Sequence, residues 1–567
     1  MSTLDWGIII GFLVLAMGIG VYHMRQATSG LDEYFVSGRK ASWWLLGTSM
    51  AATSFAADTP LAVSGFVIKS GISWNWYWWA SAMSGLLVVF FFTRFWRRSR
   101  ITTDVELIEV RYSGKPASFL RGYLAIHSGV LTNCITIGWV NLAMVKVLTN
   151  TVGVNEQHAL YFCFIFSLVY TMMSGLRGVM ATDLVQFFIS MFGAIYLAVA
   201  AVHGLGGMGG VKEALVAAQG AERAAEITSI FPRSGTDIFL PILTFIFFQW
   251  WAASNMGGGS YLVQRMLSAR DEKHAYLGTL WYNIAQYCLR SWPWIVAGLC
   301  AAALYPGLED PETGYILLMK KFLPNGMLGL VLASFFAAYM STIDTHLNWG
   351  ASYLVNDVYK RFFRREASQR HYIVASMVFT VVLAVLGMLV TTLMQSIRDG
   401  WYIITAMSGG VSIIYVLRWY WWRINAWSEI AAMVSAVIGT VVFRFWLSLP
   451  YPHVLYLIVP ITVAIALVVT FLTAPVDAAV LENFYRRIRP GGRLWDKVAQ
   501  RLPDVQPDAR PSSAVPAYVM SVIAVYGALF GVGKLLLGPW PLGVLLLGVS
   551  LGSGYGVWRY VGRVDWQ

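Results

Sequence analysis

The sequence predicts an all-α protein that crosses a membrane many times, and two observations support this fold class. Hydrophobic residues make up 57% of the 567 positions and charged residues only 12%, about half the charge that is usual in a soluble domain. Apolar runs of about 20 residues, the length that crosses a bilayer as one helix, recur from Trp6 to Trp558. We therefore expect about 15 membrane-spanning helices and no separate soluble domain.

The expected spans divide the chain into three parts. Residues 1–475 form a transmembrane core, residues 476–514 a basic cytoplasmic linker, and residues 515–567 a C-terminal hairpin of two spans. The first apolar run lacks a preceding basic residue and a small-residue cleavage site, so we interpret it as a retained span rather than a signal peptide. The spans are expected to begin near Trp6, Ser42, Ser73, Ser118, Ala159, Met180, Ile238, Ala275, Met327, Tyr372, Trp401, Ser428, Val454, Val515 and Pro541.

Basic residues lie in alternate loops of this arrangement. Clusters at 94–100, 360–365 and 486–501 account for much of the net charge of +12. Because loops rich in Lys and Arg stay in the cytoplasm, we expect the N-terminus outside and the C-terminus in the cytoplasm. We expect the protein to lie in a bacterial-type inner (plasma) membrane and to function as a monomer. Only the basic pI would favour binding to nucleic acid, so we do not expect it.

The second span is expected to be interrupted. It contains the run from Ala51 to Pro60, which combines small residues, hydroxyls, Asp58 and a proline. Pro60 removes a backbone donor, so carbonyls near Ala56 lose their helical partners. Free carbonyls at membrane depth can coordinate ions. A simple proline kink is the alternative, and the polar neighbours favour a site.

The ninth span carries a polar stripe. Ser341, Thr342, Asp344 and Thr345 lie within about one helical turn of one another. Their oxygens suit a dehydrated hard cation such as sodium, although single hydroxyls often bond only their own helix. The intramembrane Asp344 favours an ion or proton path. Asp183, at the start of the sixth span, fits a helix cap and a functional acid equally well.

The eighth span has one polar face that ends in an arginine at membrane depth. Asn283, Gln286 and Arg290 are spaced three or four residues apart. A guanidinium at this depth needs a counter-charge, from Asp58, Asp344 or a bound solute. Two aromatic clusters, at 74–79 and 250–251, fit either interfacial anchoring or walls that stack on a sugar or a cation.

These motifs resemble the sodium:solute symporter family, which includes sodium-coupled sugar, proline, pantothenate and sialic acid transporters. The most specific element is Gly-Leu-x-x-Val-x-x-Thr-Asp-x-x-Gln at 175–186, supported by Gln264–Arg270, Met340–Thr342 and Asp357–Lys360. The resemblance implies a leucine-transporter-like fold, with two inverted five-helix repeats, extra helices, and a first broken helix at Ser42–Lys69.

The resemblance also implies two cation sites. The first would take sodium through the carbonyls of Ala52, Phe55 and Ala338 and the hydroxyls of Ser341 and Thr342. A second site, present in some members, would involve Asp183, Ser341, Asp344 and Thr345. Asp344 replaces the hydroxyl usual there, so either a second cation binds more strongly or this acid exchanges protons.

Arg290 falls where the family's sugar transporters have a lysine that contacts substrate, and it favours an anionic or polyhydroxylated solute. The segments 250–259 and 417–423 depart from the sugar and proline patterns, so the resemblance does not identify the solute. The residues expected to contact it are Arg290, Gln286, Asn283, Ser54, Asp58, Thr59, Trp79, Trp251 and Tyr402.

The expected function is sodium-coupled import of a small polar solute by alternating access, with sodium, the solute and the lipid bilayer as partners. A proton-coupled or uncoupled transporter of the same fold is the alternative, and a solute sensor is a third. The sequence shows no nucleophile–base pairing, metal-ligand spacing or phosphate loop, so we do not expect an enzyme.

Overall fold

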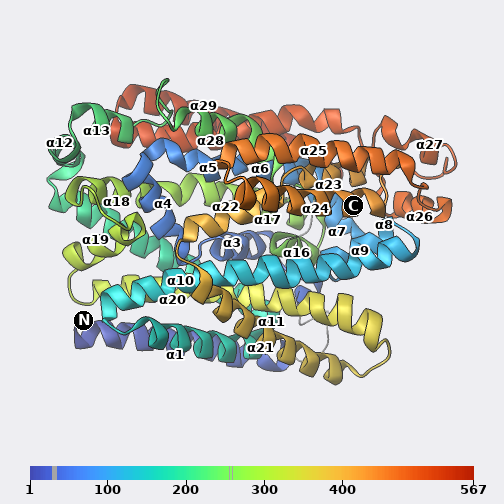
Figure 1. The fold of residues 1–567 in the computed structure, drawn as a ribbon, viewed down its shortest axis with the longest axis horizontal. Coiled ribbons are helices and arrows are strands. Elements are labelled where there is room, and N and C mark those ends of the chain that lie inside the picture. The colour runs from blue at the N-terminus through green and yellow to red at the C-terminus, as the bar shows by residue number, and fades with distance from the viewer. Residues whose placement is uncertain (28–34, 255, 258–259, 567) are drawn as a thin grey trace.

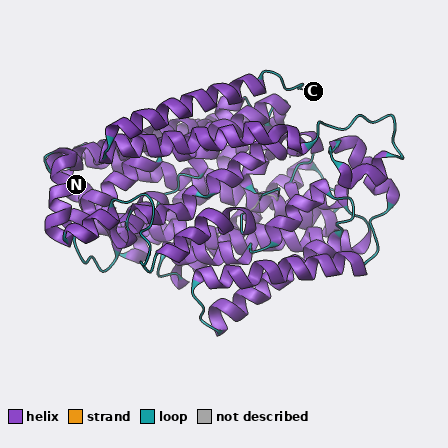
Figure 2. Ribbon diagram, turned by 90° about the horizontal axis from the view of Figure 1, so that it is seen from above, coloured by secondary structure: helices purple, strands orange, loops and turns teal. Residues whose placement is uncertain are grey.

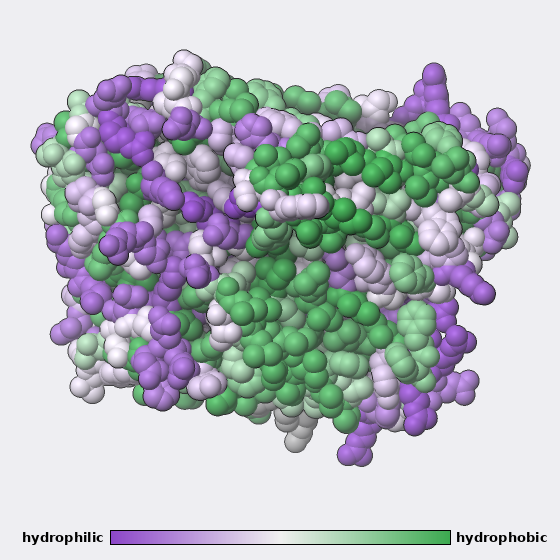
Figure 3. Space-filling model, viewed as in Figure 1, coloured by the Kyte–Doolittle hydropathy of each residue, from purple (hydrophilic) through white to green (hydrophobic). Residues whose placement is uncertain are grey.

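The protein is an elongated bundle of helices, seen in a computed structural model that describes residues 1–27, 35–254, 256–257 and 260–566. No β-strand occurs in these ranges. The helices run side by side, and the two chain termini lie at opposite ends of the bundle (Figures 1 and 2). Hydrophobic residues dominate the middle of the face in Figure 3, and hydrophilic residues gather towards both ends. This is the surface of a protein that crosses a membrane many times, as predicted.

Ten helices in the described ranges are long and apolar enough to cross a membrane, or up to 13 if each bent pair is one span. The expected total of about 15 stays a prediction. The segments that contain these ten helices are α1 (Thr3–Ala27), α9 (Gly114–Ile126) with the π-helix η4 (His127–Thr132) and α10 (Asn133–Val152), α11 (Glu156–Gly204), α17 (Glu272–Ile284) with η6 (Ala285–Leu289) and α18 (Ser291–Leu304), α20 (Met327–Tyr353) with η8 (Leu354–Phe363), α21 (Gln369–Leu393), α24 (Ala426–Thr440), α25 (Tyr451–Leu472), α28 (Val515–Leu537) and α29 (Trp540–Val561).

Three spans are bent pairs. The expected break in the second span lies between α3 (Trp43–Thr53) and α4 (Asp58–Ser70), which meet at 57°. Pro60 lies in the first turn of α4, where a missing backbone donor costs little. The pair at 72–99, which ends in α7 (Thr93–Ser99), bends by 52°.

A third break was missed by sequence analysis. α22 (Ile397–Met407) and α23 (Val411–Tyr420) meet at 46°. Gly410 between them has a φ of +79°, a left-handed conformation that glycine adopts without strain. The Gly409-Gly410 pair was the signal in the sequence.

The two spans expected from Ala159 and Met180 both lie in α11. Thr171 donates a hydrogen bond to Asp344 of α20, whereas Asp183 accepts one from Ser341. In a straight helix, Thr171 and Asp183 would lie about 18 Å apart along the axis, because each residue rises about 1.5 Å. Their partners on α20, Asp344 and Ser341, are less than one turn apart, which is about 5 Å. The chain therefore reverses between Thr171 and Asp183, which places Asp183 against the hydroxyl stripe.

Side-chain caps mark several helix starts at the ends of the bundle. Asp271 accepts a hydrogen bond from the backbone of His274 at the start of α17. Ser368 caps α21 in the same way, and Asn425 forms a reciprocal capping box with Ser428 at α24. Such residues satisfy backbone N–H groups that a helix start leaves unpaired.

The segment expected to be a linker is folded against the bundle. It contains α26 (Ala478–Ile488) and α27 (Asp496–Ala499), and Figure 1 shows both at the end where α7 and the C-terminus lie. Trp495 is fully buried and donates a hydrogen bond to the carbonyl of Trp419, at 2.9 Å. Arg98 of α7 donates to the carbonyl of Ile488 and to Glu272 of α17. The basic loops thus meet at one end of the molecule.

Candidate functional site

The helix break and the hydroxyl stripe meet inside the bundle, as predicted. Thr342 of α20 donates a hydrogen bond from Oγ1 to the carbonyl of Thr53, the last residue of α3, at 2.9 Å. The same hydroxyl lies 3.1 Å from the carbonyl oxygen of Ala338 one turn earlier. Two segments almost 300 residues apart in the sequence therefore place hydroxyl and carbonyl oxygens at one buried point.

The five residues expected to bind sodium offer the kind of ligand that this ion needs. Ala52, Phe55, Ala338, Ser341 and Thr342 are each no more than 3% exposed, and the donors they offer are all oxygens. Hydroxyls and carbonyls are the ligands that hard cations prefer. The carbonyl of Ala52 accepts a hydrogen bond from the backbone of Phe55 at 2.9 Å, which closes a tight turn at the end of α3. Sodium binding by these five residues stays a prediction.

Arg290 has different partners from those expected. Its guanidinium donates to the carbonyls of Ala51 (2.5 Å) and Ser54 (2.8 Å) at the end of α3, and the rings of Phe55 and Trp294 lie 5.3 and 5.2 Å away. Among the described residues, no carboxylate forms an ion pair with it, so the expectation of a carboxylate partner from the protein is wrong. The last carbonyls of a helix are unpaired and carry partial negative charge, and Arg290 caps them.

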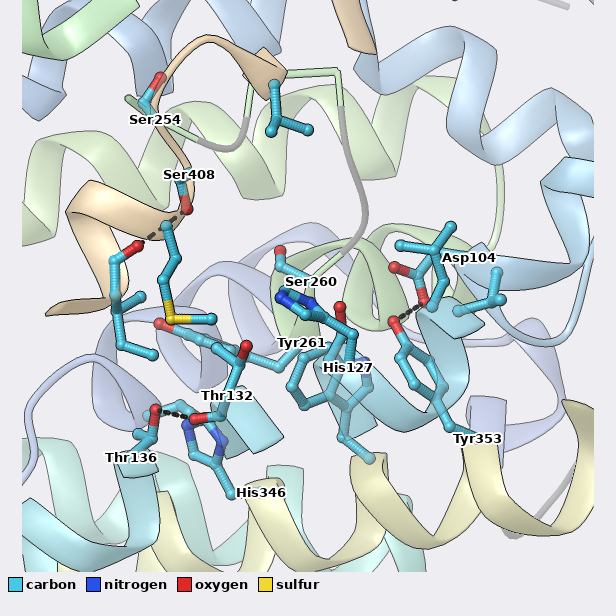
Figure 4. Close-up of a pocket in the computed structure, with 18 of the residues that line it drawn as sticks. Asp104, His127, Thr132, Thr136, Ser254, Ser260, Tyr261, His346, Tyr353 and Ser408 are labelled. Carbon is cyan, nitrogen blue, oxygen red and sulfur yellow. Dashed lines mark hydrogen bonds between the residues drawn. The ribbon is translucent and has the colours of Figure 1, made fainter. Parts of the chain in front are cut away.

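A cavity of about 360 Å³ extends from the helix break towards the end of the bundle that carries the basic loops. Figure 4 shows His127, Ser260 and Tyr261 around its centre, with Thr132, Thr136 and His346 on one side and Asp104 with Tyr353 on the other. Three of the residues expected to contact solute, Ser54, Asp58 and Thr59, line this cavity. Asp58 accepts a hydrogen bond from the indole of Trp401 at 3.1 Å.

The other residues expected to contact solute lie outside the cavity lining. Asn283 donates to the carbonyl of Thr279, Gln286 follows it on η6, and Trp79 packs against other tryptophans. Trp251 donates to the carbonyl of Phe247 one turn before it. Tyr402 stacks on Tyr451, with ring centroids 4.8 Å apart. Together with Arg290, they stay predictions as solute contacts.

Sequence analysis missed a polar face of the fourth span. Ser128, Thr132 and Thr136 are spaced four residues apart and line the cavity from η4 and α10. That spacing was visible in the sequence and would have indicated one helix face. His346, one turn after Thr342, also lines the cavity and bonds through Nδ1 to Asn133.

A cluster of aromatic side chains packs next to Asp58, through the bond of Trp401 to its carboxylate. Tyr77 stacks on Trp401 with ring centroids 6.0 Å apart and an interplanar angle of 12°. Phe66 meets both rings edge-on. At the opposite end, Asp104 accepts a hydrogen bond from Tyr353. Burial raises the pKa of the Asp104 carboxyl to about 7, although that hydrogen bond opposes the shift.

The residues expected at a second cation site are only partly brought together. Asp183 accepts hydrogen bonds from Ser341 and from Ser49. Thr345 instead accepts one from the guanidinium of Arg265 at 2.6 Å. Asp344 faces Thr171, and its Oδ2 has no hydrogen-bond partner among the described residues.

A membrane-buried cavity beside a broken helix defines a membrane transporter. The chain belongs to the sodium:solute symporter family, whose model matches residues 34–439. The family and the relatives below are transporters, so the protein is not an enzyme.

The sodium/glucose cotransporter of Vibrio parahaemolyticus is 24% identical over 484 residues, covering 80% of this chain and 87% of the relative. Sodium/glucose cotransporter 1 of Oryctolagus cuniculus is 24% identical over 483 residues, covering 77% and 71%. The solved structure of a Na⁺-coupled sialic acid symporter in a substrate-bound outward-open state has a TM-score of 0.71 at 20% identity, covering 84% of this chain and 99% of that one. At this identity, the likeness shows the fold.

Proposed function

We propose that this protein is a sodium-coupled symporter that imports a small polar solute by alternating access. The observation that carries the proposal is the meeting of the α3 break with α20, where the Thr342 hydroxyl lies 2.9 Å from the carbonyl oxygen of Thr53. Membership of the sodium:solute symporter family supports sodium as the coupled ion.

Coupling follows from the position of the sodium site between separate elements. An ion bound by the end of α3 and by Ser341 and Thr342 favours the state in which these elements are close. Solute in the adjoining cavity contacts the same break through Ser54, so ion and solute favour the same state. One sodium ion that crosses with the solute also gains about 2.3 kcal/mol per 100 mV of membrane potential, roughly a 50-fold concentration of solute.

The cavity supports an inward-facing state. If the basic loops are cytoplasmic, as the positive-inside rule predicts, the end of the cavity at Asp104 lies towards the cytoplasm. The cluster formed by Tyr77, Phe66 and Trp401 then separates Asp58 from the outside. This orientation places the N-terminus outside and the C-terminus in the cytoplasm of a plasma (inner) membrane.

The lining of the cavity favours a neutral polyhydroxylated solute over an anion. Hydroxyls of Ser54, Thr59, Thr132 and Thr136 line it, and these groups donate and accept hydrogen bonds as sugar hydroxyls do. The argument for an anion rested on Arg290, whose Nη1 and Nη2 donate to backbone carbonyls in this structure. The named solutes of the relatives, such as glucose, are the first to test.

The test is counterflow and gradient-driven uptake in proteoliposomes, with candidate sugars, sugar acids and amino acids. We expect a sugar or related polyol to accumulate only with an inward sodium gradient. Accumulation driven by a proton gradient in sodium-free buffer would replace the proposal with the proton-coupled alternative. Tight solute binding without any transport would support a sensor.

A further inference from the structure

One of the residues that line the cavity, His346, has a side chain whose orientation is fixed by its neighbours. It lies on α20, one turn after Thr342. Its ring lines the cavity on the side where Thr132 and Thr136 also lie (Figure 4). The side chain is only 5% exposed, and its ring centroid lies 5.4 Å from that of Tyr261. The imidazole is therefore a packed wall of the cavity that still reaches its interior.

Asn133 decides which nitrogen of this ring carries the hydrogen. Asn133 is fully buried at the start of α10. Its Nδ2 donates to the backbone carbonyls of His346 at 2.8 Å and of Gly129 at 3.2 Å. Carbonyls only accept, so these two bonds orient the amide and leave Oδ1 as the atom that faces Nδ1 of His346. Because Oδ1 has no hydrogen, the network assigns the hydrogen to Nδ1, which donates.

The close approach of α10 and α20 holds Asn133 in this place. Gly350 of α20 lies against it, and a Cβ atom at Gly350 would come within 2.4 Å of Nδ2 of Asn133. Such a distance is shorter than non-bonded atoms allow, so this contact requires a glycine. The orientation of the His346 ring is thus built into the packing of two helices.

The other nitrogen of the ring, Nε2, is left as a hydrogen-bond acceptor. Among the described residues His346 forms no ion pair, and a buried charge without a partner is costly, so the ring is neutral. A neutral imidazole with its hydrogen on Nδ1 has a lone pair on Nε2. Nothing in the described ranges donates to this lone pair. The hydroxyls of Thr132 and Thr136 can donate or accept, whereas Nε2 can only accept.

We propose that Nε2 of His346 accepts a hydrogen bond from a hydroxyl group of the solute and so determines specificity at this point of the cavity. The proposal rests on the proposed function and names the group that would select the solute. A carboxylate at this point would turn its own lone pairs towards that of Nε2. A deoxy sugar that lacks the hydroxyl would leave Nε2 unpaired, which is how a site rejects an analogue without the polar group it was built to bind.

The position of His346 also connects the solute to the ion. His346 and Thr342 are four residues apart and share one face of α20. Sodium bound at Thr342 and solute bound at His346 would therefore both hold α20 in the same place. Two ligands that favour one state of a shared helix are coupled.

The test is sodium-driven uptake by the full-length protein in proteoliposomes. The probes are glucose, mannose and myo-inositol, together with the single-deoxy derivatives of whichever of the three is taken up best. We expect one derivative to have a kcat/KM roughly five- to 100-fold lower than that of its parent, because a buried acceptor then has no partner.

His346→Asn separates the roles of the two nitrogens. The shorter side chain brings an amide to the place of Nδ1, where it can donate to Asn133, and offers nothing at the place of Nε2. We expect the KM for the parent solute to rise roughly two- to tenfold with little change in kcat. The disadvantage of the deoxy derivative should disappear. A purely structural role would not remove that disadvantage.

Two further variants serve as rescue and control. His346→Gln brings an amide oxygen to the place of Nε2 and should restore part of the discrimination. His371→Asn is the matched control, because His371 lies outside the cavity lining and pairs with Tyr359. It should leave both the KM and the discrimination unchanged.

The outcomes separate this proposal from the function on which it rests. A folded His346→Asn variant with the wild-type KM, or with the full disadvantage of the deoxy derivative, would overturn the role of His346 and leave sodium-driven uptake intact. Equal uptake of all the derivatives by the wild type would overturn it as well. No sodium-driven uptake of any probe by the wild type would refute the polyhydroxylated solute of the proposed function, and the proposal with it. If His346→Asn does not fold, His346→Leu, which keeps the bulk and removes both nitrogens, decides by the same criteria.

Discussion

The hydroxyl of Thr342 donates a hydrogen bond to the backbone carbonyl of Thr53, and this contact helps to join α20 to the end of α3, where the second span is broken. The carbonyl is available because α3 ends at Thr53, and the hydroxyl reaches it because α20 packs along the break.

This relationship predicts the effect of removing the α20 hydroxyls. Ser341→Ala combined with Thr342→Ala deletes two of the proposed sodium ligands and leaves the carbonyls in place. We expect the sodium concentration for half-maximal uptake to rise at least about tenfold, because a lost ligand to a charged group costs roughly 1.5–3 kcal/mol. Sodium-dependent solute uptake in proteoliposomes measures this. Ser352→Ala, on the same helix but bonded to the carbonyl of Trp349, should leave the sodium dependence unchanged. Unchanged dependence in the double variant would contradict the site.

Arg290 is predicted to matter for stability. Arg290→Ala leaves the carbonyls of Ala51 and Ser54 without donors, and each unsatisfied buried group costs about 1–3 kcal/mol. We expect a lower Tm in detergent for the solute-free protein, with partial recovery in Arg290→Lys, which keeps one charge but not the forked geometry. A variant with the wild-type Tm but a much higher KM for solute would instead place Arg290 in the solute site, as the sequence suggested.

Thr136 is predicted to contact solute from the face that sequence analysis missed. Thr136→Val keeps the shape of the side chain and removes its hydroxyl. We expect the KM for solute to rise roughly two- to tenfold, because one neutral hydrogen bond contributes about 0.5–1.5 kcal/mol. The sodium dependence should not change. Thr149→Val, on the same helix α10 and outside the cavity lining, is the control. Equal KM values for the two variants would argue against a solute contact at Thr136.

Asp104 is predicted to make stability depend on pH. Its folded-state pKa of about 7 lies above the ordinary value of 3.8, chiefly because of burial. The folded protein therefore holds a proton that the unfolded chain has lost between about pH 4 and 7. This contribution to stability is complete below pH 4 and disappears as the pH rises through 7. The measurement is Tm from pH 5 to 8: Asp104→Asn should flatten the decline, and an unchanged slope would exclude Asp104 as its source.

Local patterns predicted the features that depend on a few consecutive residues. The apolar runs indicated the spans, and the Ala51–Pro60 segment indicated the first break, because hydropathy and a missing backbone donor act within one helix. The resemblance to the family, rather than a local pattern, implied that the stripe at 341–345 lies against that break, and Thr342 and Thr345 do contact Thr53. A local signal was also present and overlooked in Gly409-Gly410 and in the row of Ser128, Thr132 and Thr136.

The sequence by itself determined a membrane bundle with a broken helix and a hydroxyl stripe on another helix, since these follow from composition and spacing along single helices. That the stripe faces the break was implied only by the resemblance to the family. Only the tertiary structure decided which charges meet. Arg290 binds the end of α3, 236 or more residues away in the chain. Arg265 reaches Asp183 from α16 (Tyr261–Ser268), which packs against α3 and α20. The partner of a buried charge depends on which groups the packing of the helices brings close to it. The spacing of residues along the chain does not determine that packing.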